Sequence, residues 1–262
     1  MHFGPPPTES FPPGLPRTDC IWLDTVDSTN RYLFRLLGHS PRPEEGLVVA
    51  ARHQTQGRGQ QQATWHTSPG ANLTASWLLY PDFLTPSGLF YLVKAVTLGV
   101  AQAVGALVEG RAAVQVKWPN DILIDGRKVA GILIENILVG TRVETSVVGV
   151  GLNVNETAFP PSLQSAAVSL RQVVGHPLSV RTVLGVVAEK LQHHYNRLRQ
   201  DHPQAYDRQY LQSLYRYQEW AQYEAHAELF EGMIVGVTAD GRLALQRAGE
   251  LRYYHPREVR YR

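Results

Sequence analysis

The stretch VQVKWPNDILIDGRKVAGILIE, residues 114–135, combines two β-branched runs with a dipeptide that favours a tight turn. In the first run, valines alternate with polar residues, which is the period of a strand with one buried face. Asp125-Gly126 supplies the positive φ angles of a hairpin turn between the two runs. Pro119 lacks the amide hydrogen that a central strand donates, so we expect the first strand to break beside it.

This predicted hairpin gathers polar side chains. Asn120 and Asp121 fall at the irregular point next to the proline, and the turn carries Lys128 back toward Lys117. Two cations beside an amide and a carboxylate suit a polyanion together with its metal ion. The simpler alternative for each lysine is a solvated side chain near a turn.

Two more polar motifs lie next to apolar strands. D-S-T-N at residues 27–30 precedes a helical pattern that ends at Gly38, so Asp27 or Ser28 is predicted to cap a helix. Q-T-Q-G-R-G-Q at residues 54–60 follows a strongly apolar strand and contains an arginine, a planar donor group for phosphate or carboxylate. Helix capping and a tight turn are the ordinary alternatives.

The order and content of these motifs resemble those of biotin protein ligases. KWPND, the short turn and KVAGIL are similar to the centre of that family, and the resemblance covers about residues 21–262. It implies an α+β fold with a mixed β-sheet covered by helices, as in the biotin and lipoate ligase superfamily. It also implies a small C-terminal SH3-like β-barrel, where strand-like runs at 233–238, 242–246 and 251–254 alternate with turns.

Three parts are expected along the chain. Residues 1–18 are rich in proline and are predicted to form a disordered tail. Residues 19–217 form the expected catalytic biotin ligase domain, and residues 218–262 form the SH3-like domain. There is no room for the N-terminal helix-turn-helix that some biotin ligases carry. We therefore expect a monofunctional enzyme without specific DNA binding.

The resemblance implies an AMP-forming reaction in two steps, with ATP and biotin as substrates and Mg²⁺ as cofactor. The carboxylate of biotin attacks the α-phosphate of ATP and forms biotinyl-5′-adenylate and pyrophosphate. A lysine of a biotin carboxyl carrier protein then attacks the adenylate. A carboxylate is already ionised at neutral pH, so the first step needs positioning and charge neutralisation rather than a general base.

Individual roles also follow from the resemblance. The implied catalytic residues are Arg58, Lys117 and Lys128. The implied biotin-binding residues are Ser28, Thr29, Asn30, Gln54, Arg58, Gly59, Gln60, Lys128 and Gly131. The implied ATP- or adenylate-binding residues are Arg58, Trp65, Lys117, Asn120, Asp121, Lys128 and Asn153. Asn120 and Asp121 are also the candidate metal ligands.

The sequence departs from the family pattern at two points. Many members carry a basic residue just after the second glycine of the loop, where this chain has Gln60. A glycine often precedes Glu-Val in the last motif, where this chain has Arg257. In the apolar run at residues 143–154, Gly149 and Gly151 indicate either close approach by a ligand or tight backbone contact.

Composition narrows the class of protein. The net charge of +2 is too small to indicate nucleic acid as a partner. A single cysteine, Cys20, excludes an intramolecular disulfide and fits a reducing compartment. The longest apolar run, residues 89–108, is interrupted by Lys94 and Gln102 and predicts a buried helix rather than a membrane span. We expect a cytoplasmic protein without membrane association, as a monomer or a homodimer.

Other periodic segments predict an alternating strand at residues 71–80 and helices at 180–200 and 203–217. His193 and His194 are adjacent, so on a helix they point about 100° apart and do not share a metal ion. We expect both to be exposed.

Two rival functions are considered. A lipoate ligase shares the fold and the adenylate chemistry, but a different glycine-rich and lysine signature is expected of it. A biotin-responsive DNA-binding regulator, or an inactive binder, is the other rival. The missing N-terminal domain weighs against the regulator, and the arginine with the two lysines weighs against an inactive site.

Overall fold

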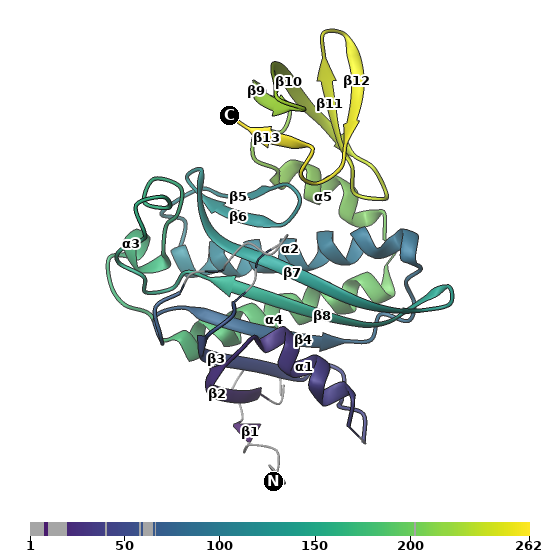
Figure 1. The fold of residues 1–262 in the computed structure, drawn as a ribbon. Coiled ribbons are helices and arrows are strands. Elements are labelled where there is room, and N and C mark those ends of the chain that lie inside the picture. Colours follow the sequence, from purple (N-terminus) through teal and green to yellow (C-terminus); the bar gives the residue numbers. More distant parts are fainter. Residues whose placement is uncertain are drawn as a thin grey trace.

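The computed structural model describes residues 8–9, 20–39, 41–57, 59, 65, 67–201 and 203–262. These residues form a mixed sheet of eight strands and a second, antiparallel sheet of five strands at the C-terminal end (Figure 1). The α+β architecture predicted from the sequence is confirmed.

The large sheet has the strand order β1-β2-β3-β4-β8-β7-β6-β5. The pair β2–β3 is parallel and the other neighbouring pairs are antiparallel. The strands are β1 (Thr8–Glu9), β2 (Cys20–Val26), β3 (Val48–Gln54), β4 (Leu73–Leu79), β5 (Val114–Lys117), β6 (Asp121–Ile124), β7 (Arg127–Val139) and β8 (Arg142–Leu152). Apart from Thr8–Glu9, the predicted N-terminal tail lies outside the described residues.

Helices cover both faces of this sheet. Helix α1 (Thr29–Leu37) buries Leu33 with Val49 and Leu78 on one face. Helices α2 (Leu89–Val108) and α4 (Val180–Gln200) share the larger core on the other face (Figure 1). Because both faces are covered, all seven residues of β4 are buried, whereas the alternation had suggested one buried face. Shorter elements are η2 (Pro86–Gly88), α3 (Leu170–Val174) and α5 (Ala205–Ser213).

Helix α2 is the apolar run that the sequence predicted to be a buried helix. Together with η2 it spans Pro86–Val108, a segment long and apolar enough to cross a membrane by length and composition alone. In the structure, 61% of its 18-residue apolar window is buried. Leu92, Val96 and Val100 belong to the core that α2 shares with α4. The helix therefore forms the centre of the folded domain.

Helix α4 has the predicted bounds, but the expectation for one of its two histidines was wrong. His194 is 1% exposed, and neither ring nitrogen has a hydrogen-bond partner among the described residues. Burial lowers the pKa of His194 to about 4, so the ring is neutral at pH 7. Its side of α4 faces Tyr206 of α5, at 5.8 Å between ring centroids. The sequence predicted a helix after α4, at 203–217, but not that this helix, α5, packs on the face of α4 that carries His194.

The C-terminal sheet has the order β12-β11-β10-β9-β13. Its inward side chains, including Tyr223, Phe230, Ile234 and Leu245, are buried. The three predicted strand-like runs correspond to β10, β11 and β12, whereas β9 and β13 were not predicted. The strands are β9 (Trp220–Ala225), β10 (Glu228–Val237), β11 (Leu243–Arg247), β12 (Glu250–Tyr254) and β13 (Val259–Tyr261).

The C-terminal part of the chain contacts the segment between β5 and β6. The indole Nε1 of Trp118 donates to the carbonyl of Gly241 at 3.0 Å. Tyr210 of α5 donates its hydroxyl to the carbonyl of Pro119 at 2.5 Å. These two hydrogen bonds tie Trp118 and Pro119, in the turn that follows Lys117, to the C-terminal part of the chain.

Candidate functional site

The hairpin predicted from the sequence is present and carries the central polar residues. Strand β5 pairs with β6 so that Lys117 lies opposite Asp121. Strands β6 and β7 are joined by Asp125 and Gly126, with φ angles of 48° and 77°. The Nζ atom of Lys128 lies 2.7 Å from Oδ1 of Asp121. The two lysines and the carboxylate thus share one side of the sheet's end.

Two cavities lie against this hairpin. The first has a volume of about 210 Å³, and its lining includes Ser28, Thr29, Asn30, Gln54, Gly59, Trp65, Asn120, Asp121, Lys128, Gly131, Gly149 and Gly151. The second has a volume of about 460 Å³, and its lining includes Trp65, Lys117, Asp121, Lys128, Asn153, Phe159, Tyr215, Arg216, Tyr261 and Arg262. Trp65, Asp121 and Lys128 line both. The described residues predicted for biotin border the first cavity. Those predicted for ATP border the second cavity, except Asn120.

A chain of hydrogen bonds supports the polar end of the first cavity. The carboxamide oxygen of Gln54 accepts the backbone N–H of Thr29 at 2.8 Å and lies 3.2 Å from the hydroxyl oxygen of Thr29. The hydroxyl of Ser76 lies 2.6 Å from that of Thr29 and donates to Oδ1 of Asn30 at 2.6 Å. Nδ2 of Asn30 donates to Glu135 at 2.7 Å. These polar groups are therefore fixed before any ligand arrives.

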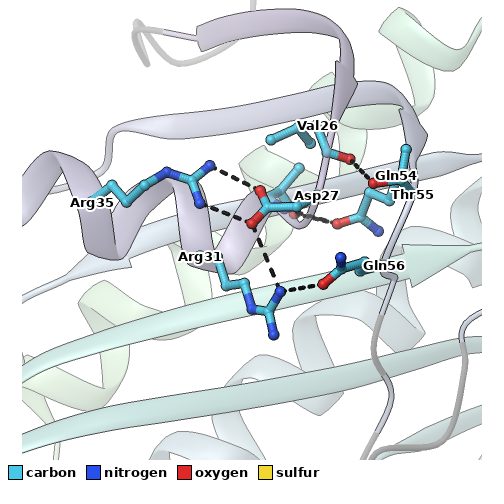
Figure 2. Close-up of polar contacts among 8 residues, drawn as sticks. Val26, Asp27, Arg31, Arg35, Gln54, Thr55 and Gln56 are labelled. Atoms are coloured by element: carbon cyan, nitrogen blue, oxygen red, sulfur yellow. Dashed lines mark hydrogen bonds and ion pairs between the residues drawn. The ribbon is translucent and has the colours of Figure 1, made fainter.

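The start of α1 is tied to the segment after β3, as Figure 2 shows. Asp27 accepts two hydrogen bonds from Arg35, at 2.9 and 2.8 Å, and these hold the pKa of its carboxyl below the usual value. Nη1 of Arg31 lies 3.8 Å from Asp27 and donates to Gln56 at 2.5 Å. Ser28 occupies the N-cap position, but its side chain makes no cap hydrogen bond. The predicted cap by Ser28 is therefore absent, and the backbone N–H of Thr29, the first residue of the helix, donates instead to the side chain of Gln54.

The glycines of β7 and β8 leave room for side chains that line the cavities. A Cβ atom at Gly149 would lie 2.5 Å from Oδ1 of Asn30. At Gly151 it would overlap the ring of Trp65, and at Gly131 it would lie 3.1 Å from Nζ of Lys128. The close approach predicted at Gly149 and Gly151 is therefore made by the protein's own side chains.

Trp65 stands between the two cavities. Its indole Nε1 is buried without a hydrogen-bond partner among the described residues. Nζ of Lys128 lies 5.8 Å from the centre of its ring. A buried donor without an acceptor is costly, so an acceptor supplied by a ligand would stabilise this arrangement.

Among the side chains that line the second cavity, the cationic ones outnumber the carboxylates. Lys117 is half-buried, and its Nζ lies 5.1 Å from the ring centre of Tyr261. Burial lowers the pKa of Lys117; Asp121 opposes this shift, while the charges of Lys128 and Arg216 add to it. Positive charges held together in a partly buried space favour an anion.

The two predicted metal ligands differ in their surroundings. Asn120 is buried in the wall of the first cavity, where its Nδ2 donates to the carbonyl of Ile132. Asp121 lines both cavities. Within the described part of the chain, no cluster of three or more His, Cys, Asp or Glu residues could hold a metal ion. One carboxylate beside an anion cavity is nevertheless a donor set that Mg²⁺ uses when phosphates supply the other ligands.

The remaining predicted residues are placed as follows. Asn153 is buried at the second cavity, and its Nδ2 donates to the carbonyl of Val168 at 3.2 Å. Arg58 and Gln60 lie outside the described residues, so their predicted roles stay predictions. The sequence did not identify four cavity-lining residues near the end of the catalytic region or at the C-terminus, namely Tyr215, Arg216, Tyr261 and Arg262.

Two curated relatives match about three fifths of the chain. The model of the biotin/lipoate A/B protein ligase family matches residues 22–153, just over half of the chain. The bifunctional ligase/repressor BirA of Bacillus spizizenii is 35% identical over 60% of this chain and 48% of that protein. The biotin–[acetyl-CoA-carboxylase] ligase of Paracoccus denitrificans is 30% identical over 63% of this chain and 68% of that protein. The chain spans about half the length of the bifunctional relatives that it matches.

A solved structure extends the likeness in fold to nearly the whole chain. The biotin protein ligase of Aquifex aeolicus, in complex with biotin and ATP, is 24% identical with a TM-score of 0.77. The match covers 93% of this chain and 99% of that chain, so it includes the C-terminal sheet. By its sequence motifs, its fold and the matching family model, the chain belongs to the biotin/lipoate A/B protein ligase family.

Proposed function

We propose that this protein is a biotin protein ligase that uses ATP to form biotinyl-5′-adenylate and then transfers biotin to a lysine of a biotin carboxyl carrier protein. The observation that carries the proposal is the pair of adjoining cavities that meet at Trp65, Asp121 and Lys128. An acid in the first cavity and a nucleotide in the second would bring a carboxylate next to an α-phosphate. The names of relatives that bind biotin and ATP agree with this assignment.

Each cavity suits its proposed ligand. The first combines glycine-lined strands with fixed amide and hydroxyl groups at one end, which is the pattern of a site for a small molecule with a polar head. The second is lined by four cationic side chains, Lys117, Lys128, Arg216 and Arg262, and by the carboxylate side chain of Asp121 among the residues described. A triphosphate would offset this excess of positive charge.

In the proposed first step, a carboxylate oxygen of biotin attacks the α-phosphorus of ATP, and the bond from that phosphorus to the bridging oxygen breaks. Lys128 lines both cavities and is placed to contact both reactants. Its ammonium group stabilises the negative charge that develops on the phosphoryl oxygens. Lys117 and Arg216 are proposed to hold the departing pyrophosphate side of the nucleotide.

Mg²⁺ is proposed to enter with the nucleotide. When bound, it neutralises phosphate charge and polarises the phosphoryl group under attack. Asp121 would supply the protein's carboxylate ligand on the side of the second cavity. Asn120 is a less direct candidate, because its Nδ2 is used by a backbone carbonyl.

In the proposed second step, the amine of the carrier's lysine attacks the acyl carbon of the adenylate. An amide bond forms, the bond between the acyl carbon and the phosphate oxygen breaks, and AMP leaves as the amine loses a proton.

We assign this activity to the cytoplasm, because the chain's one cysteine gives no disulfide framework for an oxidising compartment.

Pyrophosphate release tests the proposal. We expect release from ATP when biotin is present and background release with ATP alone or with lipoate in place of biotin. Addition of a biotin carboxyl carrier domain should then move radiolabelled biotin onto that domain. Release with lipoate but not biotin would indicate a lipoate ligase. Biotin binding without release would indicate a binding protein.

A further inference from the structure

Glu135 of β7 stands behind the first cavity. Glu135 is not among the described residues that line either cavity. It nevertheless accepts a 2.7 Å hydrogen bond from Nδ2 of Asn30, and Asn30 lines the first cavity. We propose that Glu135 is a positioning residue that sets which groups of the first cavity donate and which accept hydrogen bonds. This inference rests on the proposed function, because it concerns how that cavity recognises its acid.

The argument begins with the chemistry of the two partners. An ionised carboxylate accepts hydrogen bonds and donates none, whereas a carboxamide does both. Glu135 therefore holds the NH₂ end of Asn30 on its own side. The carbonyl of Leu133, 3.5 Å from the same Nδ2, acts in the same sense. Oδ1 of Asn30 must then face Ser76.

The direction of hydrogen-bond donation set by Glu135 continues into the wall of the first cavity. Ser76 has one hydroxyl hydrogen, and Oδ1 of Asn30, at 2.6 Å, accepts it. The contact of 2.6 Å between the hydroxyls of Ser76 and Thr29 then requires Thr29 to donate. Asn30, Ser76 and Thr29 are all buried, so water does not compensate for a reversed partner. Each hydrogen in this chain points toward Glu135.

At the cavity, this order leaves acceptor lone pairs on Thr29 and Asn30. The oxygen of Gln54 accepts the backbone N–H of Thr29 at 2.8 Å, so its amide nitrogen is the group left to donate. A cyclic urea carries N–H groups that need acceptors and a carbonyl that needs donors. The array that Glu135 fixes thus matches the ring of biotin, and the reversed array would not.

Three variants at Glu135 and one control test the proposal by titration calorimetry with biotin and with ATP. Glu135→Ala should raise the Kd for biotin roughly 10- to 100-fold, the range expected when a hydrogen bond to a charged group is lost. Glu135→Gln keeps an acceptor oxygen and should stay close to the wild-type value. Glu144→Ala, which removes an exposed carboxylate from the neighbouring strand, should leave biotin binding unchanged. The Kd for ATP should not change in any of them.

If Glu135→Ala does not fold, variants that exchange the carboxylate and the carboxamide between Glu135 and Asn30 still test the proposal. Asn30→Asp places two carboxylates against each other and should weaken biotin binding strongly. Adding Glu135→Gln restores a donor and an acceptor, so the double variant should recover much of the affinity. The ratio of the affinities for biotin and iminobiotin, which replaces the carbonyl oxygen by nitrogen, should fall in Glu135→Ala and recover in the same double variant.

The outcomes separate the two proposals. If wild-type protein does not bind biotin, the proposed function fails. If wild-type protein binds biotin but the double variant is no better than Asn30→Asp, the role of Glu135 is wrong. Equal losses of biotin and ATP affinity in Glu135→Ala would also contradict it, because a general structural defect affects both ligands.

Discussion

The two cavities differ in how the chain builds them. The first is bordered by residues of the large sheet and α1, and its polar groups are linked to one another by hydrogen bonds of 2.6–3.2 Å. The second is bordered by β5, β6 and the C-terminal residues, and its charged side chains include the ion pair of Lys128 with Asp121 and Arg262, which pairs with Glu224. We propose that the first is a preformed recognition site for the neutral ring of biotin and that the second is a site for the charged phosphates of ATP.

This difference predicts which changes affect which ligand. Substitutions behind the first cavity should alter biotin affinity and leave ATP affinity unchanged. Substitutions of the cations in the second should do the opposite. Lys128 belongs to both, so its removal should affect the chemical step more than either binding event.

Lys128→Ala should produce the largest effect. Removing one donor aimed at developing charge typically costs about 3–4 kcal/mol, or roughly two to three decades in rate. Single-turnover release of pyrophosphate measures this loss. Lys190→Ala, which removes an α4 lysine paired with its neighbour Glu189, is the matched control. Pyrophosphate release near the wild-type rate in folded Lys128→Ala would make Lys128 a solvated turn residue.

Gly149→Ala should selectively damage the first cavity. Its Cβ would meet Oδ1 of Asn30 at 2.5 Å, so Asn30 must move and its bonds to Ser76 and Glu135 must lengthen. We expect the Kd for biotin to rise roughly tenfold or more, as for a lost buried hydrogen bond. Fluorescence or calorimetric titration measures it.

The matched control is Gly105→Ala in α2, where an added Cβ meets no atom within 4 Å. This change should leave both ligands unaffected and stabilise the protein by about 1 kcal/mol, because alanine favours a helix over glycine. If Gly149→Ala binds biotin as the wild type does, the first cavity is less rigid than its hydrogen bonds indicate.

Arg216→Ala should act on the second cavity, with a smaller effect than Lys128→Ala. One charge-assisted hydrogen bond to phosphate is worth about 1.5–3 kcal/mol, so we expect roughly a tenfold or greater loss of ATP affinity. Biotin affinity should not change. Arg208→Ala, an exposed arginine of α5 that lines neither cavity, controls for lost charge. Weaker biotin binding with normal ATP binding would reverse the assignment of Arg216.

The smallest effect concerns pH. Because burial lowers the pKa of Lys117 below its ordinary 10.5, this lysine loses its proton at a lower pH than a free lysine does. ATP affinity should therefore decline as the pH rises toward the lowered pKa of Lys117. Biotin affinity should stay level over the same pH range. Lys117→Arg keeps its charge and should remove the decline. An identical decline in Lys117→Arg would assign the titration to another group.

The difference between the two cavities also explains which site residues the sequence could predict. KWPND, the Asp125-Gly126 turn and D-S-T-N are contiguous motifs, so their residues were found before the structure was known. Arg216 and Tyr261 carry no local signal, because they reach the second cavity through the path of α5 and the C-terminal sheet. His194 was misjudged for a similar reason, since its burial depends on α5. Glu135 lay within the quoted stretch, but its partner Asn30 is 105 residues away.

The central claim is that the two cavities hold two halves of one reaction intermediate. Binding of a non-hydrolysable biotinyl-adenylate, compared with biotin and AMP separately, tests this most directly. Because the linked ligand engages both cavities at once, its affinity should exceed that of biotin by roughly 10²- to 10⁴-fold. The affinity for the linked ligand should fall in Gly149→Ala, and it should stay near the wild-type value in Arg216→Ala, because Arg216 is assigned to the pyrophosphate side of ATP that the adenylate lacks. A linked ligand that binds no more tightly than biotin alone would contradict the account.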